Sequence, residues 1–149
     1  MIRTVFDELA RLELPGGWED QTIYHFRCLV GNEVEVILEL VLDRHIQHTV
    51  IERFARVKTE AIETALQGIE ILRDEETTVD GGNPAYEFVF KWIPAEGMRI
   101  YRKYVFVLKD GIGYAFSCEM GKKTFKMIGT QLKDVIETLV PGTYTPIES

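Results

Sequence analysis

The fold of this 149-residue chain is set out most clearly by residues 99–120, RIYRKYVFVLKDGIGYAFSCEM. Two runs with alternating side chains, 99–108 and 114–120, flank Asp110-Gly111-Ile112-Gly113. An Asp-Gly pair between two alternating runs is typical of a tight turn, because both residues accept the left-handed backbone that such turns need. This stretch therefore predicts two antiparallel strands joined by a hairpin.

The same alternation extends outward along the chain. It predicts strands at 11–14, 22–29, 34–42, 69–79 and 86–92, with turns at Pro15-Gly16-Gly17 and Asp80-Gly81-Gly82. In the strand at 86–92, four aromatic residues share one side: Tyr86, Phe88, Phe90 and Trp92. Since consecutive strands joined by short turns pair antiparallel, we expect one antiparallel sheet of about six or seven strands.

Two segments have helical spacing instead. Residues 49–66 begin with Thr49 and Glu52 at capping-box spacing and end before Gly68, and residues 125–139 end before Pro141. Helices with one apolar stripe pack on a sheet, so the sequence predicts an α+β sandwich with two main helices. We expect a single domain over residues 1–149, with 141–149 as a flexible tail.

Composition excludes some classes of function. The formal net charge is −7 and the isoelectric point about 5.0, which argues against a nucleic-acid-binding domain, because such domains need a cationic face. No run approaches the about 18 consecutive apolar residues of a membrane helix, so we expect no membrane insertion. Acidic residues near the start, Asp7 and Glu8, do not fit a secretory signal, which predicts a cytoplasmic protein.

Candidate reactive groups are few. Cys28 and Cys118 each lie in an apolar strand and are predicted to be buried, reduced thiols. His45 and His48 lack further ligands nearby, whereas zinc takes about four. Ser117 lies within a strand and Ser149 ends the chain, so neither resembles a nucleophile on an exposed turn. The sequence shows no catalytic signature. We therefore expect that the protein is not an enzyme and that it binds no cofactor or metal.

Two mixed strand faces remain to be explained. One carries Ile23, His25, Arg27 and Leu29, and the other carries Ile100, Arg102, Tyr104, Phe106 and Leu108. An open face of this composition is typical of a binding surface. Helices that simply cover these faces explain the same pattern equally well.

Short motifs spread along the chain resemble the DcrB-like family. The first is residues 12–22, LELPGGWEDQT, with Phe26 after them, and the second is residues 79–86, VDGGNPAY, with Trp92 after them. Tyr104-Val105-Phe106-Val107 and the closing Leu139-Val140-Pro141 are similar to later parts of the family pattern. The likeness spans nearly the whole chain.

The resemblance implies a PsbP-like α/β/α sandwich and a function. One cytoplasmic branch of the family contains Eag-type chaperones of type VI secretion systems. These form homodimers, shield apolar N-terminal transmembrane segments of effectors such as Rhs proteins, and help load them on the VgrG spike. Another branch contains periplasmic lipoproteins, which need a leader and a lipidated cysteine.

The resemblance also suggests which residues would bind a client. We expect a groove formed by Ile23, His25, Leu40, Ile100, Tyr104 and Phe106, with Arg102 as a polar contact. His25 stands where the family often has an aliphatic residue, which departs from the pattern. The alternative is a small-ligand-binding or scaffold domain of the same fold, which a deep pocket in a monomer would favour.

Overall fold

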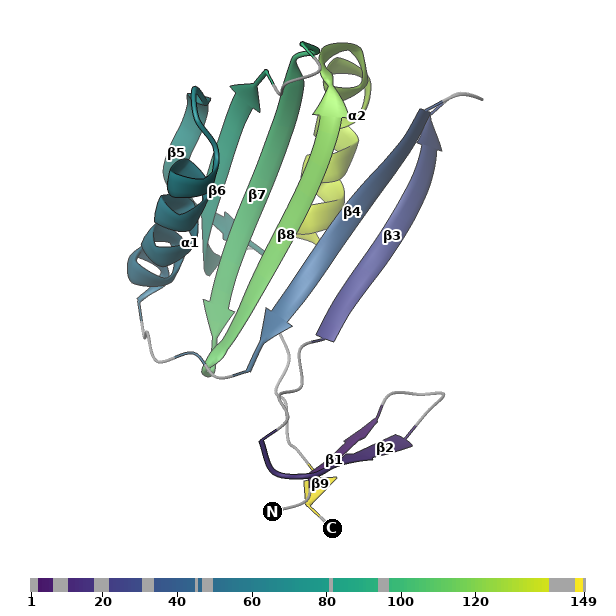
Figure 1. Cartoon of the computed structure of the whole chain (residues 1–149), viewed down its shortest axis with the longest axis vertical. Helices are drawn as coiled ribbons and strands as arrows, with labels where there is room; N and C mark the ends of the chain where they lie inside the picture. Colours follow the sequence, from purple (N-terminus) through teal and green to yellow (C-terminus); the bar gives the residue numbers. More distant parts are fainter. Residues whose placement is uncertain are drawn as a thin grey trace.

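The computed structural model describes residues 3–6, 11–17, 22–30, 34–44, 46, 50–80, 82–93, 97–139 and 147–148. Its main sheet has six strands, and every neighbouring pair is antiparallel. Their order across the sheet is β3 (Thr22–Val30), β4 (Val34–Asp43), β8 (Ile112–Gly121), β7 (Ile100–Lys109), β6 (Asn83–Trp92) and β5 (Glu70–Val79), as Figure 1 shows. The predicted antiparallel α+β fold is confirmed.

The β7–β8 hairpin forms where the Asp-Gly pair predicts it. Lys109 pairs with Ile112, so the loop consists of Asp110 and Gly111 alone. Their φ angles are 53° and 76°, the left-handed values that a two-residue type I′ turn requires at both positions. This turn matches the twist of the two strands and holds them in register.

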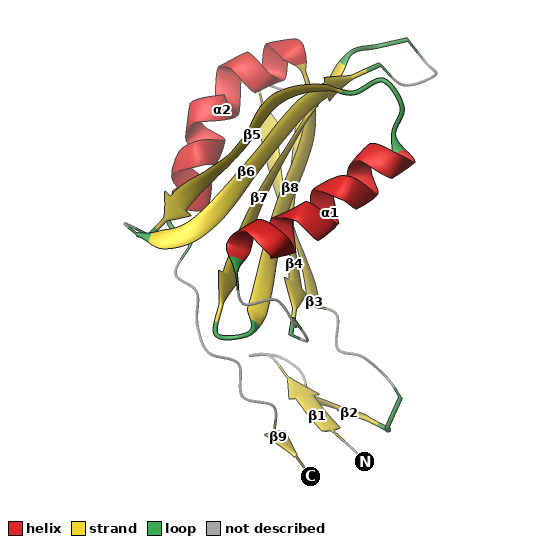
Figure 2. Ribbon diagram, turned by 90° about the vertical axis from the view of Figure 1, so that its left-hand side faces the viewer, coloured by secondary structure: helices red, strands yellow, loops and turns green. Residues whose placement is uncertain are grey.

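Two helices lie on opposite sides of this sheet, as Figure 2 shows: α1 (Ile51–Ala65) and α2 (Lys122–Glu137). Helix α1 packs on β6 and β7, and α2 packs on β5, β7 and β8. The three layers of helix, sheet and helix agree with the predicted sandwich. The proposed capping residue Thr49 lies outside the described residues, and the residue at the N-cap is Val50, whose side chain has no capping group.

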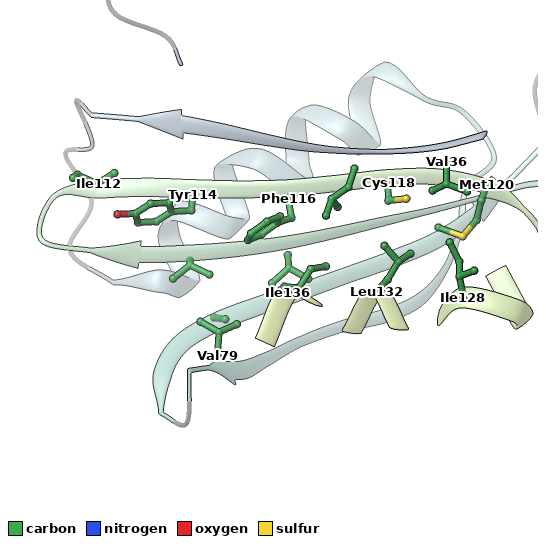
Figure 3. Packing of buried hydrophobic residues seen from close by; sticks show 14 residues of the cluster. Val36, Val79, Ile112, Tyr114, Phe116, Cys118, Met120, Ile128, Leu132 and Ile136 are labelled. Atoms are coloured by element: carbon green, nitrogen blue, oxygen red, sulfur yellow. The ribbon is translucent and has the colours of Figure 1, made fainter. Parts of the chain in front are cut away.

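The core between the sheet and α2 is aliphatic and aromatic. Figure 3 shows Ile128, Leu132 and Ile136 of α2 turned toward the α2-facing residues of β8, which are Tyr114, Phe116, Cys118 and Met120. The helix residues recur at intervals of four, which places them on one stripe. Burying such side chains stabilises the fold by roughly 1.5–3 kcal/mol each.

The core between the sheet and α1 is mainly aromatic. Phe88 and Phe90 of β6 and Phe106 of β7 are fully buried there, together with Phe54 of α1. The rings of Phe54 and Phe106 meet edge to face, with centroids 6.0 Å apart. Phe54 also lies against Gly113, where an added Cβ would come within 2.5 Å of its ring, so a larger residue does not fit without a shift.

Short strands near the chain ends form a separate small sheet in the order β2 (Arg11–Leu14), β1 (Arg3–Phe6) and β9 (Ile147–Glu148). Arg3 pairs with Glu148 and Thr4 with Ile147. Residues 147–148 of the predicted flexible tail are therefore paired, while residues 141–146 and 149 lie outside the described part of the chain. Neither described helix combines the length and the apolar composition that crossing a bilayer requires.

Candidate functional site

On the α1 side of the sheet, part of the surface has no helix over it. Figure 1 shows α1 over the β5–β6 side of the sheet, while β4 and β3 have no helix in front of them; in β8 the residues near Gly113 contact Phe54 of α1. Three aliphatic side chains are exposed there: Ile23 (44%), Leu29 (65%) and Ile37 (47%). We call this surface the open face; it consists of the α1-side residues of β3 and β4 together with the neighbouring Ser117, Glu119, Arg102 and Tyr104.

A row of polar side chains crosses the open face. Strand pairing sets His25 opposite Glu39, Glu39 opposite Ser117, and Ser117 opposite Tyr104. The imidazole Nε2 of His25 lies 3.7 Å from Oε2 of Glu39, and both side chains are substantially exposed. Because cross-strand partners lie on the same side of a sheet, the four residues form one line of donors and acceptors between aliphatic neighbours.

Arg102 is held firmly at the inner border of the open face. Its Nε donates a hydrogen bond to Oε2 of Glu119 at 2.8 Å, its Nη1 lies 3.4 Å from the Tyr104 hydroxyl, and its guanidinium lies over the ring of Trp92. Burial by itself lowers the pKa of Arg102, but the hydrogen bond to Glu119 and the attraction of nearby groups outweigh it, so the pKa is raised. This cation therefore stays charged and keeps its direction.

Between these groups the surface is hollowed. The depression has a volume of about 190 Å³, and its lining includes Ile37, Glu39, Arg102, Tyr104 and Glu119. An apolar side chain beside fixed polar groups suits a partner that is largely apolar and carries an occasional polar side chain.

The structure brings four of the seven predicted groove residues together on the open face: Ile23, His25, Arg102 and Tyr104. Ile100 lies on the same side at the start of β7, where it pairs with Trp92 and is half-buried.

Two of the predicted groove residues need correction. Phe106 is on the same side as His25 but is only 1% exposed, because Phe54 of α1 covers it. Leu40 points to the opposite side of the sheet and packs in the core beneath α2. Alternation explains the difference: Leu40 follows Glu39 directly, so the two side chains take opposite sides.

The prediction of two buried thiols is half correct. Cys118 is buried, and burial raises the pKa of its thiol to about 11, whereas Cys28 is exposed; both are free. Cys28 shares its side of β3 with Tyr24 and Phe26, which are exposed and stack with ring centroids 6.3 Å apart. Strand β3 thus presents apolar side chains on both sides.

Sequence reasoning missed Ile37 as a member of the open face. A signal for it was present, because Ile37 interrupts the polar side of its strand, between Glu35 and Glu39. The exposure of Tyr24 and Phe26 had no such signal, because alternation does not reveal whether a helix covers a strand.

The described residues hold no cluster of three or more His, Cys, Asp or Glu side chains that would suit a metal ion. His45 and His48, the pair considered for metal binding, lie outside the described part of the chain.

Comparisons with known proteins support the fold. No protein-family model matches the chain, and no curated protein matches it. Among solved structures, it is similar to a protein of unknown function from Pseudomonas aeruginosa, described as a putative regulator. The TM-score is 0.77 with 19% sequence identity, over 96% of this chain and 99% of that one. At this identity the likeness establishes a shared fold.

Proposed function

We propose that this chain is a non-enzymatic chaperone or adaptor that holds an apolar helical segment of a client protein on the open face. The client class is the N-terminal transmembrane segment of a type VI secretion effector. The observation that carries the proposal is the set of exposed aliphatic side chains, Ile23, Leu29 and Ile37, on two adjacent strands beside α1. Exposed apolar side chains beside oriented polar groups are typical of a partner site.

Dimensions favour a helix as the bound element. Strand β3 has nine residues, which span about 30 Å at roughly 3.3 Å per residue. An apolar helix of about 20 residues has the same length, at 1.5 Å per residue. Such a helix laid along β3 and β4 keeps one side away from water over its full length.

Polar groups on the open face would select among apolar helices. The row from His25 to Tyr104 and the oriented Arg102 offer hydrogen bonds to a serine, threonine or backbone carbonyl of the client. A purely aliphatic client leaves these groups without new partners, whereas a client with small polar residues uses them.

The motif resemblance at residues 12–22 and 79–86 supports the secretion setting of this proposal. A homodimer, contact with the VgrG spike during loading and a cytoplasmic location belong to the same proposal. A second copy would add a second open face, and two such faces can enclose a helix that one face leaves half exposed.

Co-expression with a defined client tests the proposal. The client is an N-terminal transmembrane segment of an Rhs-type effector, about 20 apolar residues long, fused to a soluble reporter. We expect the wild-type chain to keep the fusion soluble and to co-purify with it, and Ile37→Glu to reduce the recovered complex at least tenfold. The matched control is Val57→Glu, since Val57 (51% exposed) is similar to Ile37 (47%) in exposure but lies on α1.

Two results would overturn the proposal. One is a fusion that is equally soluble without this chain, and the other is equal recovery of the complex with Ile37→Glu and with the wild type. Circular dichroism of each variant confirms that the fold is intact.

A further inference from the structure

A second concave site lies on the other side of the sheet from the open face. It is a cavity of about 430 Å³ between α2 and strands β5, β6 and β7. Cavities that hold small organic molecules have volumes of about 300–1,000 Å³. The cavity is therefore large enough for a small ligand, and none of its lining residues has a part in the proposed client binding.

Two local features open this space. Strand β5 has an irregularity between Ile71 and Arg73, so Leu72 is an extra residue in the pairing with β6, and both Leu72 and Arg73 line the cavity. On the facing helix stands Gly129, where an added Cβ would meet no atom within 4 Å. A bulge on one wall and a missing side chain on the other leave room between them.

The cavity combines an apolar wall with a cationic set of side chains. Val89, Phe125 and Leu132 supply much of the wall. Four cations line the same space against a single carboxylate, that of Glu87; they are Arg73, Lys103, Lys126 and Lys133. This excess of cations is notable in a chain whose net charge is −7.

Lys103 is the most informative of these cations. Its side chain is 10% exposed, and its Nζ lies 3.9 Å from Oε2 of Glu87, which is beyond hydrogen-bond distance. The other carboxylate oxygen of Glu87, Oε1, lies 3.4 Å from Nη1 of Arg73, so Glu87 is paired with two cations. Within the described residues Lys103 has no other ionic partner, and its ammonium group stands at the wall of the cavity with its side chain mostly buried. An anion in the cavity would give this ammonium group a hydrogen-bonded partner of opposite charge.

We infer that this cavity is a binding site for a small amphiphilic anion, a carboxylate carried on a short apolar chain. The carboxylate accepts hydrogen bonds from Lys103, and Lys126 and Lys133 of α2 add attraction from the opposite wall. The apolar chain lies against Val89, Phe125 and Leu132. The chemistry of the wall distinguishes this ligand from a bare anion, which would leave the apolar surface in contact with water.

Titration of the full chain with octanoate tests the inference, followed by calorimetry and by two-dimensional amide NMR spectra. We expect saturable one-to-one binding, with shifts concentrated at the residues around Lys103 and Gly129. Two reference compounds separate the contributions: 1-octanol has the chain without the charge, and inorganic phosphate has charge without a chain. Each should bind at least tenfold more weakly than octanoate.

Variants locate the site. Gly129→Leu fills the cavity with a residue that favours helix, and we expect it to abolish octanoate binding while the protein stays folded. Lys103→Met removes the central charge and should weaken octanoate binding at least tenfold while leaving 1-octanol binding unchanged. The matched control is Lys123→Met, an exposed cation of α2 outside the cavity. If Lys103→Met does not fold, Lys126→Met makes the same test from the helix side.

The inference is overturned if octanoate binds Gly129→Leu as well as the wild type, if no saturable binding occurs, if phosphate binds as tightly as octanoate, or if Lys123→Met weakens binding as much as the lining variants do.

Discussion

Strands β3 and β6 are similar in sequence pattern and opposite in environment. Each carries apolar residues on both of its sides: TIYHFRCLV over 22–30 and NPAYEFVFKW over 83–92. In β6 every residue from Ala85 to Phe90 is buried, whereas in β3 every residue from Ile23 to Leu29 is exposed. The apolar content of a strand therefore does not indicate whether it belongs to the core.

Position in the sheet explains the difference. Strand β6 lies between β5 and β7 and contacts α1, with the α2 layer on its other side. Strand β3 is the end strand, pairs only with β4, and has no helix in front of it on the α1 side. An end strand with apolar side chains on both sides is open to association, which natural proteins avoid unless a partner uses it. The comparison supports the proposal that β3 and the open face bind a partner.

The largest expected difference in stability is between alanine substitutions of two phenylalanines, one from each strand. Phe88→Ala in β6 should lower the free energy of unfolding by about 3–5 kcal/mol, because Phe88 is fully buried and its removal leaves a cavity. Phe26→Ala in β3 should lower it by about 1 kcal/mol or less, since Phe26 is 51% exposed. Urea denaturation followed by circular dichroism measures both. Equal losses would contradict the comparison.

A smaller loss of stability is expected when the packing of α1 on the sheet is disturbed. Gly113→Ala places a Cβ against the ring of Phe54, and we expect a loss of about 1–3 kcal/mol in unfolding free energy. Gly129→Ala is the matched control, because its Cβ meets no neighbour and alanine favours helix, so it should stabilise by up to about 1 kcal/mol. Thermal unfolding of the two variants should shift in opposite directions. A neutral Gly113→Ala would show that α1 is loosely packed.

Tyr86 of β6 makes the stability of the fold depend on pH in the alkaline range. Burial, together with the hydrogen bond its hydroxyl donates to Oδ1 of Asp74 at 2.5 Å, raises the pKa of Tyr86 to about 12. The folded protein thus favours the neutral phenol, and this contribution to stability is complete below about pH 10, the ordinary pKa of tyrosine, and is lost as pH rises from about 10 to 12.

Tyr86→Phe should therefore cost about 1 kcal/mol at pH 7 and reduce the loss of stability between pH 10 and 12. Tyr24→Phe in β3 should change stability by less than about 0.5 kcal/mol, because Tyr24 is exposed. Unfolding free energies measured across this pH range test both variants. An unchanged pH profile in Tyr86→Phe would show that the hydroxyl has no such role.

The smallest effect on stability concerns the two thiols. Cys28 of β3 is exposed, while Cys118 of β8 is buried with its pKa raised to about 11, so iodoacetamide at pH 8 should modify Cys28 and leave Cys118 as the thiol. Mass spectrometry before and after unfolding counts the modified sites. Cys28→Ser should change the unfolding free energy by less than about 0.5 kcal/mol. Rapid modification of Cys118 in the folded protein would mean that the centre of the sheet opens to solvent.

Much of the candidate site could be predicted from the sequence, and the errors have identifiable causes. Alternation groups Ile23 with His25, and Arg102 with Tyr104, but only the pairing of β3, β4, β8 and β7 places the two groups on one side of the sheet. Phe106 has the same alternation but lies under Phe54, and no local pattern states where α1 comes to rest. Leu40 was assigned to the wrong side, although its own strand places it opposite Glu39.

The cavity on the α2 side could not be predicted at all. It depends on the extra residue in β5, on Gly129 facing it from α2, and on the meeting of Lys103 with Glu87 across two paired strands. Each of these residues has an ordinary interpretation in the sequence, as a strand residue, a helical glycine or a surface charge. They come together only once β5, β6 and β7 are paired and α2 packs on them.

Local rules in the sequence are enough to predict the order and type of the main elements, the Asp110-Gly111 turn and which residues of each strand share a face. These follow from local rules, the periods of 2 and 3.6 residues and the backbone needs of short turns. Which of those faces is covered depends on how the elements pack together. Strand order comes from pairing between distant segments, such as β4 with β8, and the place of each helix on the sheet follows from where its apolar stripe is buried. The exposure of β3 and the cavity under α2, on which the proposed functions depend, are results of that assembly.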